Sequence, residues 1–241
     1  MIKYLRYFYY LFYRPKIFYP KKSYSLLGED IFLNNYFKNQ KKGFYVDVGC
    51  YHPLSGNNTY LLYKKGWNGI NFDISPFSIE LFNFYRKKDK NIWCGISNKK
   101  GSKKIYYRKK INMLNTLDKN IAKIHFKNGF NTGKVNVNTL NYFLKKFYKM
   151  KKNIDLLKID VEGEELNVLR SMDFKKYKPK VISVEIHNQN LIYKDNKVYF
   201  KKNKIYKFLI KKNYKIIWKN KYSFIFKKNF FKPNYAISSN R

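Results

Sequence analysis

Short apolar runs alternate with amphipathic segments along most of the chain. Phe44–Gly49 and Ile70–Asp73 are apolar runs that stop at a glycine or an acid, which is typical of strands buried in a parallel sheet. The tyrosines and leucines between them predict a helix over residues 57–65. A strand, a crossover helix and a second strand form a βαβ unit, so the pattern predicts that these two strands pair in parallel.

The same alternation continues towards the C-terminus. We expect further helices over residues 31–37, 77–86, 140–144, 164–169 and 205–211, and further strands over 91–97, 154–161 and 181–187. Segments 214–218 and 222–226 flank a short polar turn, which predicts an antiparallel hairpin. Residues 98–138 are weakly periodic, and we expect an extra strand, a substrate loop or a lid there. The predicted fold class is α/β, with a mostly parallel sheet and a C-terminal antiparallel hairpin.

The composition fits a folded protein in a reducing compartment. Hydrophobic residues make up 44% of the 241 residues, which is enough to build one core. We divide the chain into a basic aromatic N-terminal arm, residues 1–24, and one domain, residues 25–241. Cys50 and Cys94 lie far apart without a CxxC pair, so we expect no disulfide framework, no zinc site and a cytoplasmic location.

The formal charge of +37 points in two directions. It arises from 52 Lys and Arg against 15 Asp and Glu, and such a field attracts nucleic acid or anionic lipid. The joint over-use of Lys, Asn, Ile, Tyr and Phe is also what an AT-rich genome produces, although that bias does not explain the scarcity of Asp and Glu. Arg6 and Arg14 interrupt the arm before the ~20 apolar residues of a membrane span. The arm either packs on its own domain or a subunit, or touches an anionic membrane peripherally.

Polar side chains stand where the predicted strands end, and ligands of open α/β sheets bind at that edge. These strand-end residues are Asp47 and Gly49, Asp73, Ser97, Asp160 and Glu162, and Glu185 and His187. Gly49 permits a tight turn and a close backbone approach to a ligand. Asp73, roughly 25 residues past that turn, is placed to accept hydrogen bonds from a ribose diol. Neither a G-x-G-x-x-G pattern nor a P-loop follows the first strand, which favours a nucleoside without phosphates over NAD or ATP.

Several segments resemble the FkbM-type methyltransferases. They are residues 44–53, 57–60, 66–71, 155–165 with 168–169, and 184–187, and Gly28–Asp30 resembles the upstream element of that family. The resemblance runs from about Ser25 to Phe226. It departs at Leu26, where the family often has Gln, and at Asp73-Ile74, where it often has Glu-Pro. The resemblance implies a Rossmann-like class I methyltransferase fold and S-adenosylmethionine as methyl donor.

The resemblance also implies roles for individual residues. Asp47 would hold the methionine end of the cofactor, Asp73 the ribose, and Ile96 with Ser97 the adenine edge. The whole expected cofactor site is Asp47, Gly49, Cys50, Asn58, Asp73, Ile74, Ile96, Ser97 and Asp160. Transfer to a hydroxyl needs an acceptor oxygen ~3 Å from the methyl carbon and a base for its proton. The candidates for that base are Asp160, Glu185, His187 and His52, and Asp160 is favoured.

Structural roles compete with these functional ones. Glu162, Glu164 and Glu165 stand where a helix begins, and acids are favoured there by the helix dipole alone. His52 is as well suited to stiffening the turn at Pro53. His187 is equally well explained as a hydrogen-bonded histidine at a strand end, and Cys50 and Ser97 as small residues that permit close packing. Carboxylates and histidines also suit Mg²⁺ or another divalent ion, although we predict no metal site.

Three functions follow from these observations. The favoured one is O-methylation of a sugar, a glycan or another small acceptor that carries a hydroxyl. RNA methylation is an alternative motivated by the charge, although nucleic acid is not the expected partner. A non-catalytic module that retains the fold and associates with a membrane or a polymer is a third, motivated by the basic arm.

Overall fold

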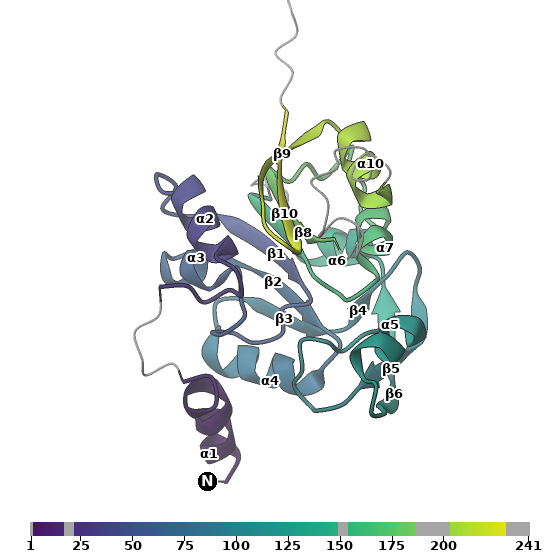
Figure 1. Ribbon diagram of the computed structural model, residues 1–241. Helices are drawn as coiled ribbons and strands as arrows, with labels where there is room; N and C mark the ends of the chain where they lie inside the picture. Colours follow the sequence, from purple (N-terminus) through teal and green to yellow (C-terminus); the bar gives the residue numbers. More distant parts are fainter. Residues whose placement is uncertain (1, 17–21, 149–153, 187–202, 230–241) are drawn as a thin grey trace, which may run out of the picture.

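A seven-stranded sheet forms the centre of the molecule (Figure 1). The computed structural model describes residues 2–16, 22–148, 154–186 and 203–229. Five strands run parallel, namely β1 (Phe44–Val48), β2 (Asn68–Asp73), β3 (Lys90–Trp93), β7 (Leu156–Ile159) and β8 (Val181–Glu185). The hairpin of β9 (Tyr214–Lys219) and β10 (Ser223–Lys228) joins β8 in antiparallel orientation. The strand order is β3-β2-β1-β7-β8-β10-β9, which confirms the predicted fold class.

The order of the strands reverses between β1 and β7. The chain leaves β1 for β2 and β3 on one side, and later returns to pair β7 and β8 on the other side. Every residue of β7 and all but the first of β1 are buried, which explains why both read as continuous apolar runs. A reversal of this kind opens a crevice at the carboxyl ends of the two central strands, where ligands bind.

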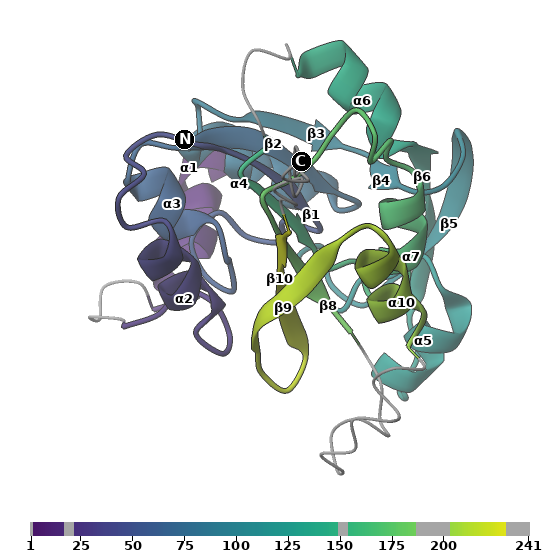
Figure 2. The same ribbon diagram turned by 90° about the horizontal axis from the view of Figure 1, so that it is seen from above.

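Helices cover both faces of the sheet (Figure 2). The helices around the main sheet are α2 (Glu29–Tyr36), α3 (Tyr60–Lys64), α4 (Pro76–Tyr85), α6 (Leu140–Phe147), α7 (Glu165–Arg170) and α10 (Lys204–Lys211). On one face α6, α7 and α10 pack against side chains such as Val46 and Leu157. On the opposite face α2 and α3 pack against Tyr45 and Leu156. Alternate residues of the central strands therefore serve two separate apolar layers.

The predicted strand over 91–97 is wrong as a single element. Residues up to Trp93 form β3, whereas β4 (Gly95–Ile96) pairs with β6 (Asn131–Asn138) in a second sheet of order β4-β6-β5. A side chain at Gly95 would begin 2.9 Å from Val137, so the glycine permits this close pairing. The apolar run continues through the break, which explains why the pattern along the chain does not reveal it.

The weakly periodic middle of the chain contains the rest of this second sheet. It holds β5 (Gly101–Tyr107), α5 (Lys119–His125) and β6, and β5 pairs with β6 in antiparallel orientation. The expected extra strand is therefore present. The segment between β5 and α5 reaches the carboxyl edge of the main sheet, where Asn112, Met113, Asn115 and Leu117 line the cleft described below.

The N-terminal arm packs on its own domain. It consists of α1 (Ile2–Phe8), purple in Figure 1, and the π-helical turn η1 (Tyr9–Tyr13). Tyr7 and Leu11 are buried against Phe77 and Leu81 of α4, and the Tyr7 hydroxyl donates to Glu80 at 3.0 Å. Among the described residues, no helix combines the length and apolarity that a membrane crossing requires.

Candidate functional site

A cleft opens where β1, β2 and β7 end, and its empty volume is about 480 Å³. Five of the residues expected at a cofactor site line it, namely Gly49, Asp73, Ile74, Ile96 and Asp160. They come from the ends of different strands, so the reversal in strand order brings together residues that are far apart in the sequence.

The turn after β1 depends on Gly49. Its φ is +77°, a conformation that side chains disfavour, and a Cβ at this position would lie 1.7 Å from the backbone oxygen of Asp160. The N–H groups of Gly49 and Cys50 both donate to the Phe72 carbonyl, at 2.9 and 3.0 Å. The ends of β1, β2 and β7 can therefore approach one another this closely only because Gly49 has no side chain.

The Asp73 carboxylate is fixed by the backbone around it. Its two oxygens accept hydrogen bonds from the N–H groups of Tyr51 and Ser75, both at 2.8 Å. Burial raises the pKa of Asp73 to about 6, although these two hydrogen bonds act in the opposite direction. A carboxylate has about four lone-pair positions, so Asp73 can also accept hydrogen bonds from a ligand in the cleft.

Lys158 is buried beside the cleft and is absent from the residues expected at the site. Its Nζ donates to the Gly49 carbonyl at 2.5 Å and lies 3.3 Å from Asp47 Oδ1 and 3.5 Å from Asp160 Oδ2. Burial alone would lower the pKa of Lys158, but the two carboxylates outweigh it and hold this pKa above its usual value. Lys158 thus connects the Gly49 turn to two acids. The only signal in the sequence is a lysine inside an otherwise apolar strand.

Four of the residues expected to bind the cofactor lie outside the cleft lining, namely Asp47, Cys50, Asn58 and Ser97. Asp47 is fully buried, and its carboxylate accepts from the Thr59 hydroxyl at 3.0 Å in addition to pairing with Lys158. Cys50 is buried beside α4, where burial raises the pKa of its thiol, and Asn58 is buried as well. Asp47 and Cys50 therefore support the turn rather than face the cleft, and Asn58 is buried outside the cleft lining.

A buried arginine, Arg86, holds the segment that follows this turn. Its guanidinium donates to the Pro53 carbonyl at 2.6 Å, to Asn57 Oδ1 at 2.7 Å and to the Thr59 hydroxyl at 2.8 Å. Thr59 in turn donates to Asp47. Arg86 therefore orders residues 53–59 through side chains that the apolar pattern of the sequence does not reveal.

His52 supports the turn and does not face the cleft. Its Nδ1 accepts from the N–H groups of Leu54 and Ser55, at 3.1 and 3.0 Å, so the ring proton must be on Nε2. Nε2 donates to the Tyr10 carbonyl of the arm at 2.9 Å. With both nitrogens occupied, His52 is not available as the catalytic base, and the alternative of a stiffened turn describes it better. The other candidate histidine, His187, lies outside the described residues.

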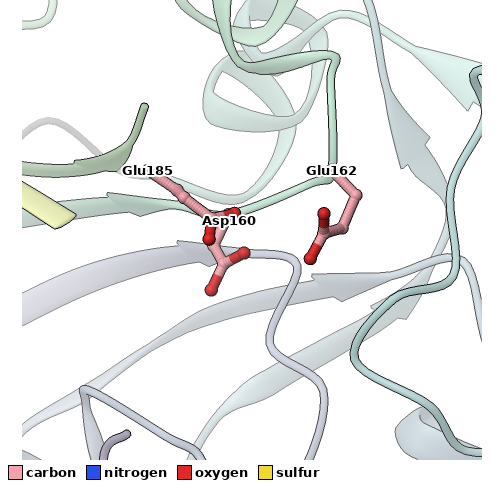
Figure 3. A group of neighbouring side chains, drawn as sticks. All are labelled: Asp160, Glu162 and Glu185. Atoms are coloured by element: carbon pink, nitrogen blue, oxygen red, sulfur yellow. The ribbon is translucent and has the colours of Figure 1, made fainter. Parts of the chain in front are cut away.

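Three carboxylates gather beyond the ends of β7 and β8 (Figure 3). One oxygen each of Asp160, Glu162 and Glu185 lies within 4.8 Å of the other two, and we call these residues the acidic cluster. Asp160 lines the cleft and its side chain is 40% exposed. Two of the three already face a basic group, because Asp160 is near Lys158 and Glu162 lies 2.9 Å from His125. Of the three carboxylates, Asp160 is the one that lines the cleft.

The loop after β7 is held in an unusual conformation. Glu162 and Gly163 both have positive φ, +52° and +107°. Glu165 accepts hydrogen bonds from the N–H groups of Val161 and Gly163, at 3.2 and 3.1 Å. Glu165 stands in the first turn of α7, and its carboxylate also holds the loop that carries the acidic cluster.

The second sheet contributes to the cleft through Glu164. This carboxylate lines the cleft, accepts from the Ser97 hydroxyl at 3.1 Å and pairs with Lys103 of β5 at 2.7 Å. Ser97, expected at the adenine edge, is fully buried and is connected to the cleft only through Glu164. Glu164 stands at the start of α7, as expected from the sequence, and it also lines the cleft.

Comparison with known protein families agrees with this architecture. A family model described as the methyltransferase FkbM domain matches residues 47–216, which include the Gly49 turn and the acidic cluster. None of the curated proteins compared with the chain matches it. The sheet, mostly parallel and completed by an antiparallel hairpin, is that of class I methyltransferases. The chain therefore belongs to the FkbM family of S-adenosylmethionine-dependent methyltransferases.

Proposed function

We propose that this methyltransferase binds S-adenosylmethionine in the cleft and methylates a hydroxyl of a sugar, a glycan or another small acceptor. The observation that supports this most directly is the position of Asp160. Its carboxylate stands in the same cleft as Gly49 and Asp73, and it is tied to the Gly49 turn through Lys158. A proton acceptor and a nucleoside-binding edge therefore share one cavity.

The residues of the cleft fit the chemistry of this cofactor. Asp73 would accept hydrogen bonds from the ribose hydroxyls, and Ile74 and Ile96 offer apolar contact for the adenine. Asp160 and Glu164 supply negative charge near a cationic ligand. When bound, the cofactor supplies a methyl group on a positively charged sulfur.

In this proposal Asp160 is the catalytic base. The bound cofactor would supply the methyl group to the acceptor oxygen, and the Asp160 carboxylate would take the proton of the acceptor hydroxyl. Lys158, with its Nζ 3.5 Å from this carboxylate, fixes the orientation of Asp160. Glu185, which shares the acidic cluster, is the second candidate to take the proton.

The test separates binding from turnover. Calorimetry with S-adenosylhomocysteine should show that Asp73→Ala abolishes binding, whereas Asp160→Ala should retain binding but lose methyl transfer. Transfer is measured with labelled S-adenosylmethionine and a panel of glycans, small hydroxylated molecules and RNA. Absence of any binding by the unmodified protein would contradict the proposal, as would full turnover of Asp160→Ala.

RNA is the second candidate acceptor, because the formal charge is +37. Binding to phosphates should weaken steeply with salt, so undetectable or salt-insensitive RNA affinity removes this candidate. A non-catalytic role is a third possibility, and release of labelled methyl product onto any acceptor of the panel excludes it.

A further inference from the structure

The outer face of the N-terminal arm exposes a group of large apolar side chains. Ile2 is 82% exposed, Tyr4 63%, Leu5 62% and Tyr13 66%. The opposite face of the arm is anchored, because Tyr7 and Leu11 are buried in the cluster around α4. The exposed group is therefore held in place on the surface of a folded domain.

The charges around this face indicate its partner. Residues 2–16 contain Lys3, Arg14 and Lys16, which are exposed, and Arg6, which pairs with Glu80 of α4 at 3.3 Å; none of these residues is acidic. Tyrosine and leucine beside lysine and arginine are the combination that lies at the boundary between lipid headgroups and acyl chains. A second protein chain could also cover the apolar side chains, but binding a protein would not require basic residues around them.

We propose that this outer face, formed by Ile2, Leu5 and Tyr13 with Lys3, Arg14 and Lys16 beside them, docks on an anionic lipid bilayer. The apolar side chains enter the interfacial layer, and the basic groups contact lipid phosphates. Docking leaves the packing of the arm on α4 intact, since the buried face is not used. The protein then acts at a membrane surface without crossing it.

Sedimentation with lipid vesicles tests this proposal. The full chain should bind vesicles that contain phosphatidylglycerol at least tenfold more tightly than pure phosphatidylcholine vesicles, and high salt should weaken the binding. The double variant Leu5→Ser/Tyr13→Ser should reduce binding at least tenfold. The control Ile124→Ser/Tyr142→Ser removes side chains of similar exposure, 55% and 46%, from other helices and should bind normally.

Both double variants change exposed positions, and unchanged melting temperatures would show that both still fold. Equal vesicle binding by the two variants would overturn the proposal. It would also be overturned if Leu5→Ser/Tyr13→Ser abolished dimerisation in light scattering while the dimeric parent failed to bind vesicles. That result would assign the face to a second copy of the chain.

A separate observation concerns Asn115 in the cleft. Its side-chain oxygen is buried, and it has no hydrogen-bond partner among the described residues. Asn115 lines the same cleft as Ile74, Gly95 and Leu117, and a Cβ at Gly95 would contact both Ile74 and Leu117. These residues mark one end of the cleft. A buried amide oxygen without a partner is costly unless a ligand supplies the donor.

We infer, resting on the proposed function, that Asn115 recognises the adenine base by accepting a hydrogen bond from its exocyclic amine. An asparagine amide pairs well with adenine because it offers an acceptor and a donor side by side. Ile74 provides apolar contact at the same end of the cleft. Asn115 would thus distinguish an adenine from a base that carries an oxygen at this position.

Calorimetry with two ligands tests this role. The unmodified protein should bind S-adenosylhomocysteine more than tenfold more tightly than S-inosylhomocysteine, in which a carbonyl replaces the amine. Asn115→Leu should lose this preference, and Asn120→Ala, at an exposed position on α5, should retain it. If Asn115→Leu keeps the preference, the role of Asn115 is refuted. If the unmodified protein binds neither ligand, the proposed function itself fails.

Discussion

Replacing Lys158 with methionine removes one buried positive charge and keeps a side chain of similar length. The Lys158 side chain is 2% exposed and Asp47, its nearest carboxylate, is fully buried. Asp47 Oδ1 has no hydrogen-bond partner within the described part of the chain, so Lys158 is its main compensation. Removing one partner of a buried ion pair costs about 3–5 kcal/mol. Each kcal/mol lowers the melting temperature of a chain this long by about 2–4 °C, which predicts a loss of roughly 6–20 °C.

Thermal unfolding followed by circular dichroism measures this loss, and two further variants interpret it. Lys180→Met breaks a pair with Asp155 in which the lysine is 38% exposed, so it should cost at most about 1 kcal/mol. Asp47→Asn/Lys158→Met removes both charges and should recover much of the stability lost by Lys158→Met. Equal melting temperatures for Lys158→Met and Lys180→Met would refute the reasoning, as would a double variant no more stable than Lys158→Met.

Three other predictions concern the cleft. Gly49→Ala should prevent cofactor binding and destabilise the fold strongly, because the added Cβ would collide with the Asp160 backbone. The control is Gly129→Ala: its φ is also positive, +91°, but the added Cβ meets no atom, so this variant should lose only about 1 kcal/mol through backbone strain. Affinity for S-adenosylhomocysteine, measured by calorimetry, should fall about tenfold from pH 7 to pH 5. The reason is that Asp73, whose pKa is raised to about 6, becomes protonated and accepts hydrogen bonds less well. The variant Asp73→Asn should show no such fall. Chelation with EDTA should leave methyl transfer unchanged, because Lys158 and His125 already face two carboxylates of the acidic cluster. If EDTA abolished methyl transfer and added Mg²⁺ restored it, the protein would have a metal site.

The raised pKa of Asp73 also has a consequence for the unliganded protein. A carboxyl group whose pKa is higher in the folded state than in the unfolded state binds protons preferentially when folded. Its contribution to stability is therefore largest below its unfolded pKa, near 3.8, and is lost as the pH rises through about 6. The ionised form of Asp73, which the proposed ribose contact requires, is the form that the fold accommodates less well, as is common for residues at ligand sites.

The sequence predicts the central strands well and their sheet membership poorly. β1 and β7 are buried on both faces, so their apolar runs are visible without any tertiary information. The hairpin is visible because a polar turn separates two apolar segments. The break at Cys94 is not visible in the sequence, because it arises from the pairing of β4 with Val137 and Asn138, which are distant along the chain.

The site shows a similar division. Gly49 and Asp73 are predictable because each stands at a strand end with a distinct chemical capacity. Lys158 is not predictable, because it is one of 52 basic residues and differs from the others only in being buried between two acids, which the sequence does not show. Asn115 lies in the weakly periodic segment, where no pattern locates it relative to the cleft. Residues that act through buried contacts with distant strands are therefore the ones that sequence patterns miss.

The distribution of acids explains how so basic a protein can hold a cationic cofactor. Seven of the 15 acidic residues stand at or next to the ends of β1, β2, β7 and β8, namely Asp47, Asp73, Asp160, Glu162, Glu164, Glu165 and Glu185. The overall charge of +37 repels a sulfonium at long range, but charges separated by more than about 8 Å are largely screened at physiological salt. The cleft therefore responds to its own acids, whereas the basic exterior remains effective towards extended anionic partners such as the surface of a bilayer. One chain thereby presents opposite charges to its cofactor and to its surroundings.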